Sequence, residues 1–167
     1  MPANYLHGIE TTEVENGARP VKTVKSAVIG LIGTAPSGPV NEATLCLSET
    51  DAARFGTQLS GFTIPQALDA IYDHGAGTVI VINVLDPAVH RNRITDESVA
   101  FDAVTGIAQL ENTAVLECTL KSADGSTTYT EGSDYSLNAV HGKLTLVKGG
   151  KITGEARATY DYADPTK

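Results

Sequence analysis

Residues 26–36, with the sequence SAVIGLIGTAP, constrain the fold of this chain more than any other segment. The segment has apolar side chains at both odd and even positions, and its two glycines add no polarity; the apolar residues are Val28, Ile29, Leu31 and Ile32. Such a run is typical of a strand that is buried on both faces, as central strands of parallel sheets are. We therefore predict a central strand here, in which a charge at Ile29 or Ile32 prevents folding.

A second strand and a helix follow this one. Residues 78–85, TVIVINVL, are again apolar on both parities and predict the partner strand. Between the two, Thr63 is a candidate N-cap, Pro65 lies in the first turn, and apolar residues recur at helical spacing; these are Ile64, Ala67, Leu68, Ile71 and Tyr72. The pattern predicts a strand–helix–strand unit whose helix ends at Gly75.

Smaller elements are expected around this unit. Residues 43–47 predict a short strand, and Ser48 with Asp51 has capping-box spacing for a short helix that ends at Gly56. Residues 86–102 are charged and have no apolar period, so we interpret them as a linker.

From residue 112 the apolar period changes to two. Ala114, Leu116, Cys118 and Leu120 alternate with more polar positions, and Asp124–Gly125 predicts a tight turn. Further short strands separated by Gly turns are predicted at residues 127–130, 135–137, 144–147 and 155–162. The predicted fold class is therefore α+β, with an N-terminal arm at residues 1–20, an α/β part with its linker at 21–102, and a small all-β sandwich at 103–167.

Composition excludes several classes of function. The net charge of −8 disfavours nucleic acid, which is bound by clustered Lys and Arg. Only 5% of residues are aromatic, which weakens a carbohydrate-binding interpretation based on Tyr160 and Tyr162. Cys46 and Cys118 have neither disulfide-framework nor metal spacing. With no apolar stretch of membrane-spanning length and no signal-peptide pattern, we expect a soluble protein made in a cytoplasm.

Several sets of residues have a spacing that could suit a catalytic, metal or cofactor site. Gly33 and Gly38 have the glycine spacing of a phosphate-binding loop, but Pro39 and Val40 stand where Lys and Ser or Thr would hold phosphate and Mg²⁺. Asp86 with His90 lacks a third ligand nearby, and Asp134 with Asp161 has a strand-and-turn context. We therefore predict no enzyme, no metal and no cofactor. A nucleotide-binding α/β domain with an appended β module remains the alternative.

The first twenty residues are polar and rich in Thr and Glu. Residues 9–14 favour extended backbone, but Ile9 and Val14 lie on opposite parities and give the segment no apolar face. Such a segment is either a frayed terminus or a strand that pairs with a sheet elsewhere.

Taken together, these segments resemble contractile tail sheath proteins of bacteriophages and related injection particles. The resemblance is carried, in order, by residues 5–9 (YLHGI) with Glu13, residues 17–20 (GARP), SAVIGLIGTAP, IPQALDAIYDHG and TVIVINVLD. Residues 103–167, ending in TYDYADPTK, resemble the small β-sandwich that some sheath proteins carry before their main α/β domain. Family members are much longer, so the resemblance implies that this chain is the N-terminal portion of a sheath protein.

The resemblance implies a structural role with homo-oligomeric partners. Subunits stack as rings, hexameric in expectation, around an inner tube, and contraction drives that tube through a cell envelope. The particle assembles in the bacterial host cytoplasm and resides in the virion tail, with the tube contacts in parts outside this chain. The residues implied to add as an intersubunit strand are Gly8, Ile9, Glu10, Thr11, Thr12, Glu13, Val14 and Glu15.

Overall fold

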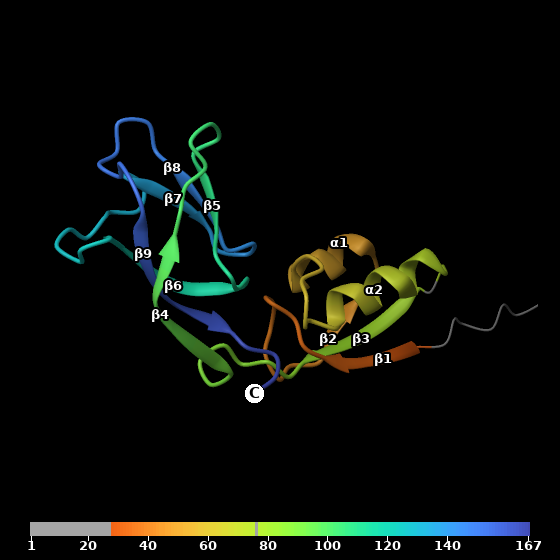
Figure 1. The fold of residues 1–167 in the computed structure, drawn as a ribbon. Helices are drawn as coiled ribbons and strands as arrows, with labels where there is room; N and C mark the ends of the chain where they lie inside the picture. The colour runs from red at the N-terminus through yellow and green to blue at the C-terminus, as the bar shows by residue number, and fades with distance from the viewer. Residues whose placement is uncertain (1–27, 76) are drawn as a thin grey trace, which may run out of the picture.

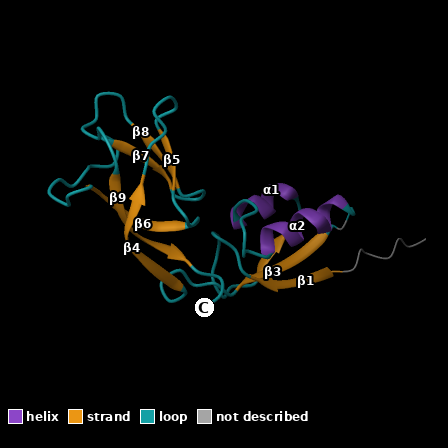
Figure 2. Ribbon diagram, viewed as in Figure 1, coloured by secondary structure: helices purple, strands orange, loops and turns teal. Residues whose placement is uncertain are grey.

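The computed structural model describes residues 28–75 and 77–167, which form two units joined side by side (Figure 1). We call residues 28–85 the α/β unit and residues 91–163 the two-sheet unit. The fold is mixed α+β, and strands contribute more residues than helices do (Figure 2). The predicted arm at residues 1–20 lies outside the described residues.

The α/β unit contains a three-stranded sheet with the strand order β1-β3-β2. β1 (Val28–Gly33) and β3 (Thr78–Asn83) pair in parallel, while β2 (Thr44–Cys46) pairs antiparallel with β3. The helices α1 (Glu49–Ala52) and α2 (Ile64–Asp73), with a short 3₁₀ turn at Ala53–Phe55 between them, cover one face of this sheet (Figure 1). The predicted strand–helix–strand order is therefore present.

The prediction that β1 is central and buried on both faces is wrong. β1 lies at the edge of the sheet, and β3 takes the central position. Ile29 and Leu31 pack against the core under the helices, but Val28 and Ile32 are 59% and 69% exposed. Apolar side chains occupy both odd and even positions of β1, yet the described residues cover only one face of this strand.

The second face of the sheet forms a continuous apolar surface, which we call the open sheet face. Ile80 on β3 pairs with Leu45 on β2 and with Gly30 on β1, so the outward side chains of all three strands lie on the same side. The exposed apolar side chains on it are Val28, Ile32, Leu45 and Ile80.

Both predicted helix starts are present, but they are stabilised differently. The Ser48 hydroxyl accepts a hydrogen bond from the Asp51 amide at 3.3 Å, as capping-box spacing predicts. Thr63 makes no side-chain cap for α2; its Oγ1 accepts a hydrogen bond from the Thr34 amide at 3.1 Å instead. The hydroxyl that was predicted to cap the helix therefore connects the helix to the loop after β1.

The two-sheet unit consists of two antiparallel three-stranded sheets. The strands β4 (Arg91–Val99), β9 (Ala156–Ala163) and β6 (Val115–Ser122) form one sheet in the order β4-β9-β6. The strands β5 (Ile107–Gln109), β8 (Lys143–Leu146) and β7 (Tyr135–Asn138) form the other in the order β5-β8-β7. Inward side chains of both sheets share one core, in which Leu120, Leu144 and Tyr160 are almost completely buried.

Three predictions in this region need correction. The predicted strand at residues 127–130 is only an isolated bridge, in which Thr128 pairs with Lys121. The expected linker at residues 86–102 contains the strand β4. Its charged residues alternate because one face of the strand is exposed to solvent. The register of β4 with β9 shifts at a bulge between Ile94 and Glu97. A second shift, between Val115 and Glu117, turns Val115 inward and leaves Leu116 40% exposed. Strict alternation predicted the opposite, because a bulge inserts one residue and reverses the faces on one side of it.

The chain enters and leaves the two-sheet unit at the same place. Arg91 at the start of β4 pairs with Ala163 at the end of β9, and the Asp164 amide donates a hydrogen bond to the His90 carbonyl at 2.9 Å. A small core beside this point joins the two units, with Leu59 packed against it; its buried members are Phe62, Leu85, Ala114 and Ala163.

Candidate functional site

The glycine-spaced loop at residues 33–38 uses its backbone donors within the fold. The Ala35 amide donates to Asn83 Oδ1 at 3.0 Å, and the Thr34 amide donates to Thr63 Oγ1. Phosphate-binding loops instead direct several free amides at the ligand, and Pro36 has no amide hydrogen to offer. The loop is therefore arranged as a structural turn between β1 and the rest of the α/β unit.

Asp86 and His90 stabilise a tight turn between the two units. The Asp86 amide donates to His90 Nδ1 at 2.9 Å, the His90 amide donates to the Asp86 carbonyl at 2.7 Å, and Asp86 Oδ1 accepts from the Ala88 amide. These interactions account for both residues as turn formers. Among residues 28–75 and 77–167, no group of three or more His, Cys, Asp or Glu is placed to hold a metal ion.

Asp134 and Asp164 are buried carboxylates with structural partners. Asp134 accepts hydrogen bonds from the amides of Thr130 and Lys151, both at 2.9 Å, and these bonds lower its pKa. Asp164 accepts from the hydroxyl and amide of Thr166, which lower its pKa in the same way. Asp134 and Asp161, considered as a carboxylate pair, have separate sets of partners.

These carboxylates predict a loss of stability in acid. Because their folded-state pKa values lie below the unfolded value of about 3.9, they stabilise the fold fully above that pH. We expect the urea midpoint to fall progressively as the pH drops below about 4, since protonation then removes the preference for the folded state. Asp134→Asn should flatten this fall of the urea midpoint in acid, whereas Asp73→Asn, which removes an exposed carboxylate at the end of α2, should leave it unchanged. A fall that is identical in both variants would contradict the assignment.

Two candidate residues from the sequence belong to the core region of the two-sheet unit: Tyr160 is buried within the core, and Cys118 is partly buried against it. Tyr160 is 1% exposed, and its hydroxyl donates to Glu97 Oε2 at 2.6 Å and accepts from Asn112 Nδ2 at 3.1 Å. Burial, together with the Glu97 hydrogen bond, raises its pKa to about 12. Burial likewise raises the pKa of the Cys118 thiol to about 11. Neither group is available as a stacking platform or as a thiolate at neutral pH.

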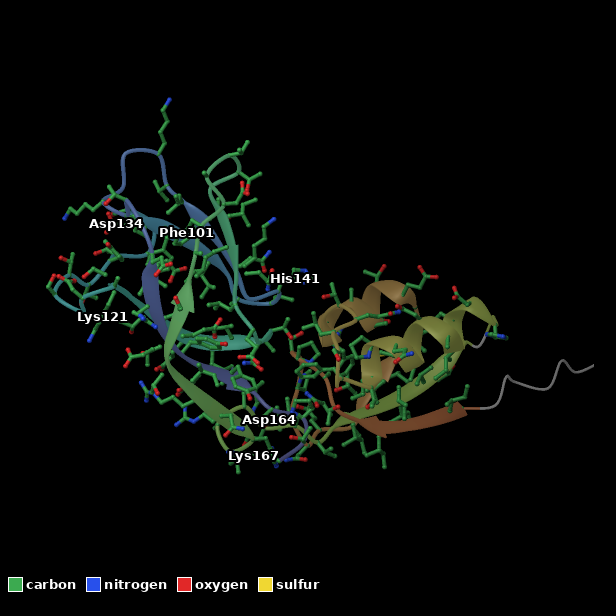
Figure 3. The ribbon with its side chains drawn as sticks, viewed as in Figure 1. Phe101, Lys121, Asp134, His141, Asp164 and Lys167 are labelled. Atoms are coloured by element: carbon green, nitrogen blue, oxygen red, sulfur yellow. The ribbon has the colours of Figure 1, made fainter. Side chains whose placement is uncertain are left out.

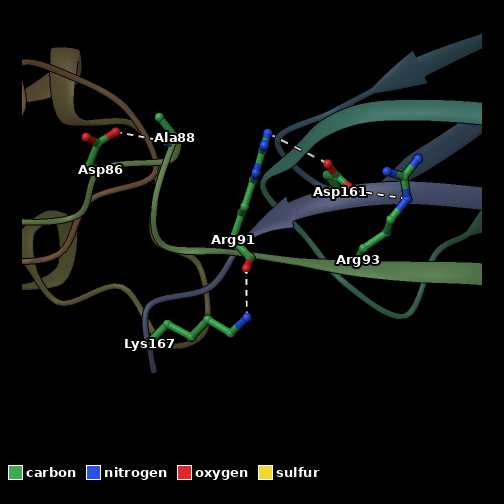
Figure 4. A network of polar contacts seen from close by, with 6 residues as sticks. All are labelled: Asp86, Ala88, Arg91, Arg93, Asp161 and Lys167. Carbon is green, nitrogen blue, oxygen red and sulfur yellow. Dashed lines mark hydrogen bonds and ion pairs between the residues drawn. The ribbon is translucent and has the colours of Figure 1, made fainter.

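Cationic side chains gather where β4, β9 and the C-terminal segment meet (Figure 4). Arg91 Nη1 and Arg93 Nε lie 3.8 and 3.5 Å from the two carboxylate oxygens of Asp161, and Lys167 Nζ donates to the Arg91 carbonyl at 3.0 Å. With Asn92, these four residues line a hollow of about 350 Å³, which we call the arginine hollow. The Asp161 carboxylate is buried, whereas the side chains of Arg91 and Arg93 are 50% and 65% exposed.

A second charged hollow lies on the helical side of the α/β unit. It has a volume of about 320 Å³ and is lined by Glu49 of α1, by Asp69, Tyr72 and Asp73 of α2, and by Gln58. We call it the acidic hollow. Asp69 Oδ2 accepts a hydrogen bond from Gln58 Nε2 at 2.6 Å, and no cationic side chain lines the hollow.

Neither hollow was expected from the sequence, where Arg91 and Arg93 fall within the predicted linker at residues 86–102. The period-two alternation from Arg91 to Ile94 was an available signal for a strand with cations on its outer face. Residues 8–15, which were predicted to add as an intersubunit strand, lie outside the described part of the chain.

Comparison with known proteins identifies a close relative. Over 170 aligned positions, which cover the whole chain, it is 62% identical to the tail sheath protein of Burkholderia phage BcepMu. The predicted resemblance to tail sheath proteins is confirmed. The chain spans 36% of the length of that relative.

A family model described as a protein of unknown function matches residues 86–167. This match begins in the turn before β4 and includes β9, so it covers the whole two-sheet unit. In the described residues, no helix is long and apolar enough to cross a membrane.

Proposed function

We propose that this chain is the N-terminal portion of a tail sheath subunit, which polymerises into rings around an inner tube and contracts to drive that tube through a cell envelope. The observation that carries this proposal is the 62% identity over the entire chain to a phage tail sheath protein. The rings are hexameric in this proposal, and the tube contacts lie in parts of the subunit beyond these residues. Assembly takes place in the bacterial host cytoplasm, and the product is the virion tail.

Within such a subunit, the α/β unit belongs to the sheath core and the two-sheet unit is the β-sandwich module. The strand β4 and the family match from residue 86 support an earlier start for this module than residue 103. A structural role is supported by the candidate motifs of the sequence, since the loop at residues 33–38, the pair Asp86 and His90, and Asp134 all make their contacts within turns and loops of the fold. Nothing in the loop at residues 33–38 favours the nucleotide-binding alternative, and calorimetric titration with Mg²⁺–nucleotide should show no binding.

The arm contributes to assembly in this proposal by adding a strand to a neighbouring subunit. An added strand of this length makes about four to six main-chain hydrogen bonds, at roughly 0.5–1.5 kcal/mol net each. Ordering the arm opposes much of this gain, at about 1–2 kcal/mol per residue. A single junction is therefore weak, and repetition around a ring makes the assembly firm.

Deletion of residues 1–15 from the full-length subunit is expected to abolish extended tubes and leave a folded monomer. The reason is that the deletion removes the added strand but no described part of either core. Electron microscopy of negatively stained assemblies measures the outcome, and circular dichroism verifies the fold.

Replacement of residues 8–15 by an equally long Gly/Ser segment serves as a length-matched comparison. It should also prevent tubes, because the flexible segment has low strand propensity. Normal tubes from the deletion variant would refute the role of the arm, while an intact subunit that forms no tubes under any condition would refute the proposed function.

A further inference from the structure

The arginine hollow and the acidic hollow have opposite charges and are both accessible. Two half-exposed arginines share the single buried Asp161 carboxylate, so their positive charge is only partly neutralised. Lys167 adds a further cation at the edge of the same hollow. An incoming carboxylate would gain charge-assisted hydrogen bonds from guanidinium groups that already face solvent.

The α/β unit supplies the complementary surface. Arg54 is the only Lys or Arg in residues 28–85, and it already lies 3.6 Å from Asp51. The carboxylates of Glu49 and Asp73 make no hydrogen bond or ion pair with other described residues. The acidic hollow is therefore free to receive cations from outside the chain.

Unused hydrogen-bonding capacity occurs at the acidic hollow. Tyr72 lines this hollow, and its hydroxyl is a buried oxygen without a hydrogen-bond partner among the residues that the structure describes. Buried polar atoms are normally paired, so a cationic donor that enters the hollow would find a favourable partner there.

The two hollows are arranged so that one molecule does not bring them together. In Figure 3, Lys167 lies at the foot of the molecule beside the C-terminal end of the chain, whereas the helices that carry the acidic hollow lie on the other side of the α/β sheet. A contact between unlike surfaces of identical copies is heterologous, and it generates a ring or a helical filament rather than a closed pair.

We propose that the arginine hollow of one copy binds the acidic hollow of a second copy. This inference rests on the proposed assembly of copies and names two surfaces that meet in it. A second copy is favoured over nucleic acid because the chain carries a net charge of −8, which repels a phosphate backbone, while the acidic hollow offers the carboxylates of Glu49, Asp69 and Asp73 to the exposed cations.

Zero-length cross-linking tests this contact directly. A carbodiimide joins a lysine amine to a carboxylate in contact with it, so a mixture of ¹⁵N-labelled and unlabelled protein should give mixed-isotope peptides that join Lys167 to Asp69, Asp73 or Glu49. The yield should fall as salt is raised, because exposed ion pairs are screened. Cross-links found only within one chain would overturn the proposal.

Charge reversal provides the second test. Arg91→Glu with Arg93→Glu should lower the yield of these cross-links about tenfold, because like charges then oppose each other. Glu49→Lys with Asp73→Lys should lower the cross-link yield to the same extent, and it leaves the arginine hollow and Asp161 unchanged. This variant therefore tests the contact even if the arginine variant fails to fold. Mixing the two reversed variants should restore the cross-links. Lys148→Glu with Lys151→Glu matches the charge change of the arginine variant on an exposed loop and should leave the yield unchanged.

Three outcomes separate the possibilities. Equal yields in the reversed and native proteins would overturn the contact. Protection of the arginine hollow by a short DNA duplex, without cross-links between copies, would assign it to phosphate instead. Electron microscopy of the full-length variants distinguishes a failure of this contact from a failure of the proposed function. Normal tubes from both reversed variants would overturn the contact, whereas the proposed sheath function would be unaffected.

Discussion

Val81→Asp is expected to prevent folding of the α/β unit, whereas Ile32→Asp should leave the unit folded. Val81 lies on the central strand β3 and is fully buried beneath the helices, so an aspartate there is a buried charge with no cationic partner. The effective cost of such a group is several kcal/mol, a large part of the total stability of a small domain. Circular dichroism and thermal melting measure the result.

Ile32→Asp is the matched substitution because it introduces the same charge into the same sheet. The Ile32 side chain is on the open sheet face and is 69% exposed, so the carboxylate stays hydrated. We expect a change within about 1 kcal/mol, which reflects strand propensity alone. Loss of folding in Ile32→Asp, at the level seen for Val81→Asp, would show that the open sheet face is covered.

Asn83→Leu is expected to destabilise the protein by roughly 2–6 kcal/mol, because two buried amides lose their acceptor at about 1–3 kcal/mol each. Asn83 ends β3 and is 1% exposed. Its Oδ1 accepts from the Ala35 and Leu85 amides at 3.0 and 3.1 Å, and its Nδ2 donates to the Ala35 carbonyl at 3.4 Å. Leucine has a similar volume but offers neither group.

Urea denaturation of Asn83→Leu measures this loss of free energy of unfolding. Gln58→Leu, which removes an exposed amide, is the comparison and should change stability by less than about 0.5 kcal/mol. If both variants unfold at the same urea concentration as the native protein, the loop after β1 is not held by Asn83.

The order of elements could be predicted from sequence, but the position of β1 in its sheet could not. Apolar periodicity located β1, β3 and α2 because each depends on local spacing and on turn residues such as Gly75, whose φ is 74°. Whether a strand that is apolar on both parities is central depends on which layers cover it. That information is carried by contacts between segments distant in sequence.

The candidate site was predictable to a smaller extent. Arg91 and Arg93 alternate as strand residues do, yet their partner Asp161 is about seventy residues away and is placed by the pairing of β4 with β9. The bulges in β4 and β6 have no glycine to mark them, so simple alternation assigned Leu116 to the wrong face. The sequence shows Asn83 as a polar residue in an apolar strand, but it does not indicate that the Ala35 and Leu85 amides are its partners.

In the sheath subunit proposed above, which would transmit force during contraction, the pairing of Arg91 with Ala163 would have a mechanical consequence. Because the two ends of the two-sheet unit lie on adjacent strands, tension that travels along the α/β chain can cross from one strand to the other at this junction. We expect the two-sheet unit to be a side branch of that path, because chain ends that lie close together favour the exchange or circular permutation of a unit.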